Sequence, residues 1–168
     1  RGRSGWLVDA DRYTAATYVA HVQAFLAALG IDEIDLVGTS MGGIIGMGLA
    51  AATPDLVRRL VLNDVGGFIP KDALAPIAAY LGERPPVFAD LLALERHLRT
   101  IHQGFGRLDD DAWAHLARHS ARPVPEGFTL HYDPRITGPF LASTAADIDL
   151  WALYDAVTCP TLVLRGST

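Results

Sequence analysis

One short stretch constrains the fold of this chain more than any other, the sequence Gly38-Thr39-Ser40-Met41-Gly42 between two apolar segments. The preceding residues 34–37 are typical of a short strand, and residues 41–52 are small and apolar throughout, which is typical of a buried helix. A strand that turns directly into a helix brings the two backbones close together, so the positions two before and two after the apex favour glycine. We therefore predict a tight strand–turn–helix unit with Ser40 at its apex.

This turn suits nucleophilic chemistry. A serine hydroxyl becomes an effective nucleophile when it is exposed, lies beside a base and faces donors that stabilise an oxyanion. The turn exposes Ser40 and places the amide of Met41 at a helix N-terminus, where developing negative charge is favoured. We predict that Ser40 is the nucleophile, that Met41 contributes a backbone oxyanion donor, and that Gly38 and Gly42 form the turn.

The turn has two alternative interpretations. One is a structural turn with an incidental serine, and the other is a phosphate-binding loop, which is also glycine-rich and also precedes a helix. The sequence lacks the Lys-Ser/Thr ending of a P-loop and the G-x-G-x-x-G spacing of a dinucleotide site. The phosphate-binding interpretation is therefore rejected.

The surrounding pattern predicts the fold class. Residues 14–64 alternate helix, strand, helix and strand, and the strands are continuous apolar runs, as in parallel strands covered on both faces. This predicts an α/β fold with a doubly wound parallel sheet. The expected elements are a helix over 14–28, capped by Thr14 and ended by Gly30, a strand over 34–37, a helix over 41–52 and a strand over 60–62.

The pattern changes after Gly66-Gly67. Helices alone are predicted up to residue 120, an irregular segment then follows, and a buried strand returns near the end of the chain. We predict part of an α/β core over 1–67, a helical cap over 68–150 and a return to the core over 151–168. The expected elements are helices over 71–81, 87–103, 110–120 and 148–154, an irregular stretch over 121–147 and a strand over 160–164.

The turn Gly38–Gly43, followed by Leu60-Val61-Leu62-Asn63-Asp64, resembles the α/β-hydrolase superfamily in its cap-bearing branch of esterases, lactonases and C–C hydrolases. The opening Arg1–Gly5 is similar to the glycine-rich loop after the fourth strand of that branch. The closing 159–166 resembles its seventh strand. The resemblance implies a helical lid inserted after the sixth strand, and a triad in the chain order Ser, acid, His.

The chain opens at Arg1 without an initiator methionine and closes directly after a strand-like run, so we expect it to be a fragment. The acid and the histidine of the triad are expected beyond Thr168, and the second oxyanion amide before Arg1, so the chain by itself should be inactive. Asp64 is a candidate acid, since it ends the sixth strand of the family. Its alternative role is to cap the lid hinge through side-chain hydrogen bonds.

The cap segment supplies further candidates. Four aromatic residues are candidates to line an apolar substrate pocket, with ordinary packing as the alternative: Phe105, Trp113, Tyr132 and Phe140. His115 and His119 have the spacing of zinc ligands, but no Glu follows His115 and no third ligand is apparent, so no metal site and no cofactor are predicted. Arg3 and Arg165 flank the expected active edge and are candidates to meet a carboxylate, with solvated loop positions as the alternative.

Composition excludes several classes of function. The net charge is −5, from 14 basic and 19 acidic residues, with no basic run, so nucleic acid is not an expected partner. No apolar stretch is long enough to span a bilayer, and the single cysteine, Cys159, fits a reducing, cytoplasmic location.

We predict a serine hydrolase of a small or medium ester, lactone or related carbonyl substrate. The alternatives are C–C bond hydrolysis, cofactor-free perhydrolysis, or a ligand-binding protein of the same fold without catalysis.

Overall fold

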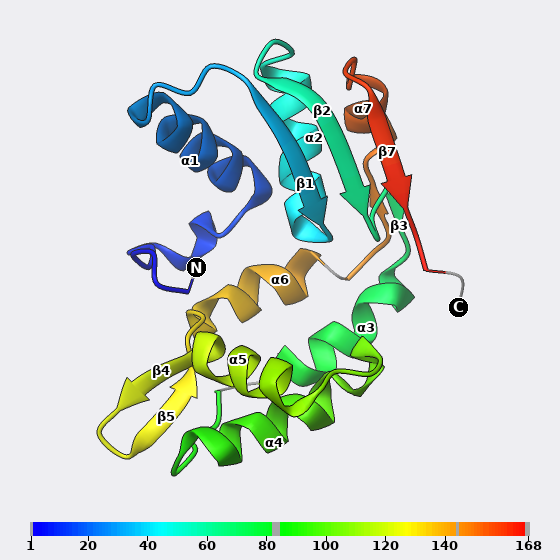
Figure 1. The fold of residues 1–168 in the computed structure, drawn as a ribbon. Helices are drawn as coiled ribbons and strands as arrows, with labels where there is room; N and C mark the ends of the chain where they lie inside the picture. Colours follow the sequence, from blue (N-terminus) through cyan, green and yellow to red (C-terminus); the bar gives the residue numbers. More distant parts are fainter. Residues whose placement is uncertain (1, 82–84, 144, 167–168) are drawn as a thin grey trace. The chain divides into compact units, whose positions relative to one another are not determined.

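The computed structural model describes residues 2–81, 85–143 and 145–166, which form two compact units (Figure 1). We call the unit made of Asp9–Pro76 and Gly138–Thr168 the sheet unit, and the unit made of Arg1–Val8 and Ile77–Thr137 the helical unit. Two helices contain the unit boundaries, α3 (Lys71–Leu81) and α6 (Thr137–Ser143). Pro76 lies inside α3 at one boundary, where it removes a helical hydrogen bond.

The sheet unit is built on a parallel sheet with the strand order β1-β2-β7. The strands are β1 (Ile34–Thr39), β2 (Val57–Asn63) and β7 (Thr161–Leu164). Thr39 pairs with Asn63, and Asn63 pairs with Leu164, so the carboxyl ends of all three strands meet at one edge. The predicted α/β class and the predicted joining of the strands near Leu60 and Thr161 in one sheet are confirmed.

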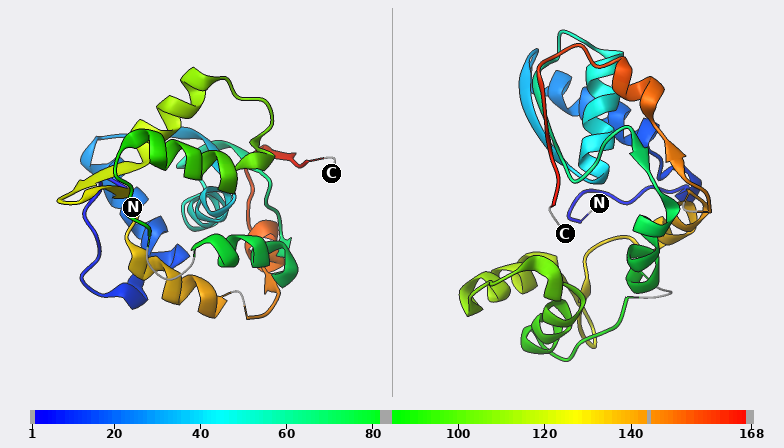
Figure 2. Two further views of the ribbon diagram at one scale, coloured as in Figure 1. Left: turned by 90° about the horizontal axis from the view of Figure 1, so that it is seen from below. Right: turned by 90° about the vertical axis from the view of Figure 1, so that its right-hand side faces the viewer.

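Helix α2 (Met41–Ala52) packs against β1 and β2, with α1 (Ala15–Ala28) and α7 (Trp151–Asp155) beside it on the same face of the sheet (Figure 2, right). As predicted, α1 begins after Thr14, whose hydroxyl accepts a hydrogen bond from the Thr17 amide, and α2 begins directly after Ser40. The buried core between these layers consists of Leu26, Met47, Leu49, Ala50, Leu56, Val57, Leu60 and Leu62.

Within this chain, part of the sheet is covered on one face only. All four residues of β7 are exposed, and the side chain of Val37 in β1 is 73% exposed. The reason is that α2 covers the opposite face of β1 and β2, and β7 is the edge strand of the described sheet. Apolar composition alone predicts burial without saying what covers the strand.

A second, two-stranded antiparallel sheet joins β3 (Phe68–Ile69) to β6 (Ile148–Asp149). The Leu150 amide donates to the Gly67 carbonyl at 2.8 Å, and a Cβ at Gly67 would collide with the ring of Trp151. These contacts join Phe68–Ile69 to Ile148–Asp149 within the sheet unit. The helical unit is therefore shorter than the predicted insertion over 68–150, and the helix expected from residue 148 begins at Trp151.

The helical unit contains α4 (Leu91–Ile101) and α5 (Asp110–Ser120), which pack around Leu94, Leu98, Trp113 and Ala117. Helix α5 matches its prediction. Helix α4 starts later than residue 87 because Phe88 is extended, with two backbone hydrogen bonds to Phe128 at 2.7 and 2.8 Å. Asp90 then caps the helix by accepting from the Ala93 amide at 2.7 Å.

The prediction that residues 121–147 are irregular is wrong, because this segment contains a β-hairpin and α6. The hairpin joins β4 (Ala121–Val124) to β5 (Gly127–Leu130), and Gly127 has φ 134°, a backbone conformation that glycine adopts readily. Pro123 lies within β4, and a proline normally argues against a strand, which is why the pattern was missed. Three short 3₁₀ helices complete the described chain: Ala10–Arg12, Gln103–Phe105 and Pro134–Ile136.

An arginine ties the amino-terminal segment to the helical unit. The Arg135 guanidinium donates to the carbonyls of Leu7 at 2.7 Å and Val8 at 3.2 Å, and to the carboxylate of Asp133 at 2.8 Å. The Asp133 side chain is fully buried, so the pair satisfies a charge that would otherwise be costly to bury. Sequence reasoning predicted no role for either residue.

Candidate active site

The turn between β1 and α2 places Ser40 in a strained backbone conformation. Its φ is 52° and its ψ is −119°, and its side chain is exposed. A non-glycine residue in such a region costs about 1–3 kcal/mol and persists only where its surroundings hold it. Ser40 is held from both sides, because its amide donates to the Asn63 carbonyl at 3.0 Å and its carbonyl accepts from the Gly43 amide at 2.9 Å.

The glycines of the turn are not equivalent. A Cβ on Gly38 would lie 2.5 Å from the Gly42 carbonyl oxygen and 2.6 Å from the Gly43 amide nitrogen, so the strand and the helix touch there. A Cβ on Gly42 would meet nothing within 4 Å among the described residues. At Gly43 a Cβ would collide with Val65. The close approach predicted for both flanking glycines is therefore observed at Gly38, while the described part of the chain leaves space at Gly42.

The N-terminus of α2 lies directly behind Ser40. Met41 is the first residue of the helix, and the first amides of a helix have no carbonyl partner within it. They carry the positive end of the helix dipole, which favours an anion beside Ser40. Met41 is 53% exposed, so its side chain is not part of the buried core.

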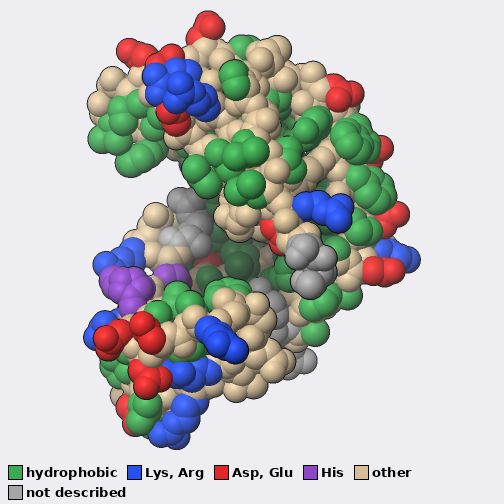
Figure 3. Space-filling model, turned by 45° about the vertical axis from the view of Figure 1, so that its right-hand side comes forward, with side chains coloured by type: hydrophobic (Ala, Val, Ile, Leu, Met, Phe, Trp, Pro, Cys, Tyr) green, Lys and Arg blue, Asp and Glu red, His purple; other side chains and the backbone are tan. Residues whose placement is uncertain are grey.

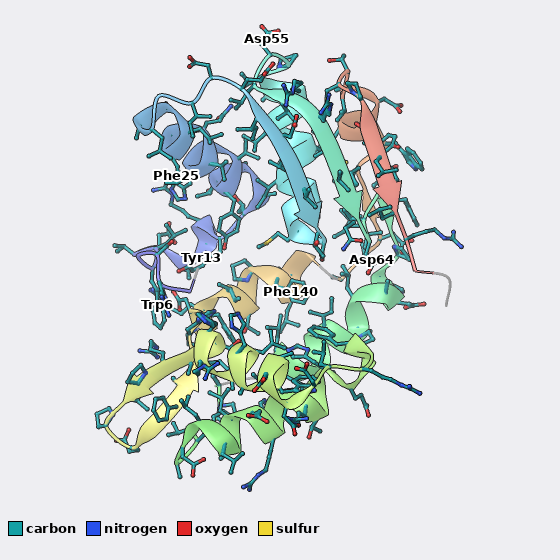
Figure 4. The ribbon with its side chains drawn as sticks, viewed as in Figure 1. Trp6, Tyr13, Phe25, Asp55, Asp64 and Phe140 are labelled. Carbon is teal, nitrogen blue, oxygen red and sulfur yellow. The ribbon has the colours of Figure 1, made fainter. Side chains whose placement is uncertain are left out.

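The residues after β2 lie next to the turn at the same edge of the sheet. Asp64 follows Asn63 with φ 58°, is exposed, and donates its amide to the Leu164 carbonyl at 2.8 Å (Figure 4). The side-chain amide of Asn63 donates to the hydroxyl of Thr39 at 3.1 Å. Strand pairing thus brings Asp64 into the neighbourhood of Ser40, as the sequence predicts. The Asn63–Thr39 bond has no signature in the sequence, because it depends on the register of two strands.

Five of the six histidines lie in the helical unit, and His21 lies on α1 of the sheet unit. Histidine side chains gather in one patch of the face shown in Figure 3. The rings of His115 and His119 lie 4.1 Å apart between centroids, but the described residues contain no group of three side chains suited to hold a metal ion. Burial lowers the pKa of His102, with the charge of His97 as a smaller cause.

The four aromatic candidates do not share one environment. Trp113 is 6% exposed in the core of the helical unit, so packing accounts for it. Phe105 is 58% exposed and stacks on His102 at 4.5 Å. Tyr132 lines a cavity of about 320 Å³ within the helical unit. Phe140 belongs to α6 in the sheet unit (Figure 4).

The two arginine candidates also fall in different units. Arg3 lies in the amino-terminal segment of the helical unit. Arg165 is exposed and directly follows Leu164, which pairs with Asn63 at the edge that carries Ser40. None of the described helices combines the length and the hydropathy needed to cross a bilayer.

Comparison with known proteins finds hydrolases and the α/β-hydrolase fold. A family model described as "alpha/beta hydrolase fold" matches residues 2–112. The chain is similar to a 3-hydroxybutyrate-oligomer hydrolase of Cupriavidus necator, with 41% identity over 99% of this chain and 60% of that protein. It is also similar to a 2-hydroxymuconate semialdehyde hydrolase of Pseudomonas putida, with 34% identity over 92% of this chain and 52% of that protein.

Among solved structures, an α/β hydrolase from Novosphingobium aromaticivorans superimposes with a TM-score of 0.85. It shares 34% sequence identity, and the match covers all of this chain and 60% of that structure. The chain thus spans between half and two thirds of the length of these relatives.

Proposed function

Because this chain belongs to the α/β-hydrolase fold family, we propose that it carries the nucleophile of a serine hydrolase that acts on a small or medium ester, lactone or related carbonyl compound. The observation that carries the proposal is the backbone of Ser40, with φ 52° and an exposed side chain at the carboxyl end of β1. A structural turn has no need for a strained serine, whereas a nucleophile elbow requires one.

In the proposed reaction the Ser40 oxygen attacks the carbonyl carbon of the substrate while a base takes its proton. The negative charge that develops on the carbonyl oxygen is stabilised by the Met41 amide at the start of α2. The C–O bond to the leaving group breaks, and the base gives its proton to the departing alkoxide while the acyl group stays on the Ser40 oxygen. Water then loses a proton to the same base and attacks the acyl-enzyme, which releases the carboxylic acid and returns the proton to Ser40. In the family's triad the base is a histidine, which follows the serine and the acid in chain order.

Asp64 is the candidate in this chain for the acid that orients that histidine. It lies at the same sheet edge as Ser40, one residue after the strand that bonds to the Ser40 amide. Its alternative role is structural, because aspartate and asparagine tolerate the left-handed backbone that φ 58° represents. The helical unit is proposed to act as the cap, with Tyr132 and Phe105 as candidates to contact substrate.

Ester hydrolysis is preferred because oligomers of 3-hydroxybutyrate, named in the Cupriavidus necator relative, are joined by ester bonds. A second candidate is hydrolysis of a C–C bond next to a carbonyl, which the similarity to the Pseudomonas putida hydrolase favours. Both reactions use the same serine and oxyanion donors, so they are separated by substrate rather than by the geometry of the turn.

The proposal is tested in the full-length protein with a p-nitrophenyl ester of a short acyl chain and a fluorophosphonate probe. Ser40→Ala should abolish probe labelling and reduce ester cleavage to the residual rate that binding alone supports. Ser4→Ala, which removes another exposed serine hydroxyl, should change neither. Labelling at a residue other than Ser40, or full activity of Ser40→Ala, would replace the hydrolase proposal with the ligand-binding alternative.

The same assays decide the role of Asp64. Asp64→Asn keeps a residue that tolerates positive φ but removes the negative charge. If Asp64 orients the histidine, kcat should fall by at least about a hundredfold, since the loss of a triad acid costs up to about 10⁴-fold. A change of less than threefold would assign Asp64 to the turn alone.

A further inference from the structure

The strained backbone of Ser40 must be held by its surroundings, and one residue contacts the turn twice. Asn63, at the end of β2, accepts a hydrogen bond from the Ser40 amide through its backbone carbonyl at 3.0 Å. Its side-chain amide donates to the Thr39 hydroxyl at 3.1 Å. Asn63 therefore bonds to the serine and to the residue before it, on the side of the turn opposite α2.

The two contacts differ in what they need from the sequence. The backbone bond forms with any residue at position 63, because it continues the pairing of β1 with β2. The side-chain bond needs a donor of the right length at 63 and an acceptor at 39. Thr39 and Asn63 are paired neighbours on parallel strands, so their side chains point to the same face of the sheet.

That face is the one that α2 leaves uncovered. Gly38 is buried beneath the start of α2, while Val37 and Thr39 on either side of it are exposed. Helix α2 holds the turn from its own face through the Gly43 and Ile44 amides, which donate to the Ser40 carbonyl at 2.9 and 3.2 Å. The Asn63–Thr39 bond is the corresponding side-chain restraint on the opposite face.

We propose that Asn63 is a positioning residue for the nucleophile, acting through its side-chain hydrogen bond to Thr39. It touches neither the substrate nor the Ser40 hydroxyl. It fixes the end of β1 relative to β2 and so limits the orientations in which Ser40 presents its oxygen. Reaction rates depend on angstrom-scale placement of the attacking atom, so this restraint acts on the chemical step rather than on substrate binding. The inference rests on the proposed function of Ser40.

The test is a double-mutant cycle in the full-length protein with Asn63→Ala, Thr39→Val and both changes together. The loss of a neutral hydrogen bond corresponds to about a three- to tenfold effect. Each single variant should therefore lower kcat and the rate of fluorophosphonate inactivation by about this factor, with KM changed less than twofold. The double variant should be no slower than the slower single variant, because both remove the same bond.

A matched control exists in the same unit. The Gln23 side-chain amide donates to the Thr53 hydroxyl at 2.9 Å. This is the same type of hydrogen bond, amide to threonine hydroxyl, between residues that are not part of the turn. Gln23→Ala should lower thermal stability by an amount similar to Asn63→Ala while leaving kcat and the inactivation rate unchanged.

Three outcomes would overturn the inference. They are an unchanged kcat in Asn63→Ala, additive effects of the two substitutions, or an equal loss of kcat in Gln23→Ala. Each differs from failure of the proposed function itself, in which Ser40→Ala retains activity and no probe labels Ser40.

Discussion

Replacing Gly38 with alanine should destabilise the protein, whereas replacing Gly42 should not, although both glycines belong to the same motif. A Cβ at position 38 would lie 2.5 Å from the Gly42 carbonyl oxygen. Ordinary van der Waals contact begins at 3.4 Å, so the shortfall is 3.4 minus 2.5, or 0.9 Å. The atoms in the way are backbone, so β1 and α2 must separate by roughly this distance.

The magnitude follows from that separation. Overpacking in a close-packed interior costs about 1–3 kcal/mol, and the rigid backbone at this contact puts Gly38→Ala at the upper end, about 2–3 kcal/mol. For a chain of this size that corresponds to a fall in Tm of about 4–12 °C. The methyl group of Gly42→Ala meets nothing within 4 Å, and alanine is the better helix former by up to about 1 kcal/mol. Its stability should be equal or slightly higher.

The measurement is urea unfolding followed by far-ultraviolet circular dichroism, with ester hydrolysis assayed in parallel. Gly38→Ala should also lower kcat, since it displaces Ser40 from the end of α2, while Gly42→Ala should keep most of the activity. Equal destabilisation by the two substitutions would refute the reasoning, because it would mean that position 42 is as crowded as position 38.

Two further predictions concern strain and buried charge. Ser40→Gly should be more stable than Ser40→Ala by about 1 kcal/mol in urea unfolding, since glycine adopts φ 52° without strain, and equal stabilities would argue against strain at this residue. Arg135→Met should destabilise the protein by about 2–3 kcal/mol, because it leaves the fully buried Asp133 carboxylate without its cation. Adding Asp133→Asn should recover part of that loss; if the double variant is less stable than Arg135→Met, the loss has another origin.

Much of the sheet unit could be predicted because its signals are local. The apolar runs around Gly38 and Ser40 predict a strand and a helix within a residue or two of those observed. Thr14 and Gly30 mark the ends of α1, since capping depends on residues adjacent in the chain.

The helical unit was harder to predict because distant segments decide its local structure. Phe88 is extended rather than helical because it bonds to Phe128, forty residues away in the chain. The hairpin around Gly127 forms despite a proline in one strand, because pairing across a short turn outweighs the propensity of one residue. Trp113 is a candidate to line a pocket because it is aromatic, but in the structure it packs in the core of the helical unit.

The sequence by itself determined that Ser40 occupies a turn between a parallel strand and a buried helix, since spacing and residue size suffice to specify that geometry. Only the tertiary structure decided which residues surround the turn. Strand register brings Asn63 to Thr39 and Asp64 to the same edge, and packing makes Gly38 crowded and Gly42 open. These contacts are set by how separate elements meet in three dimensions, which no local spacing in the chain records.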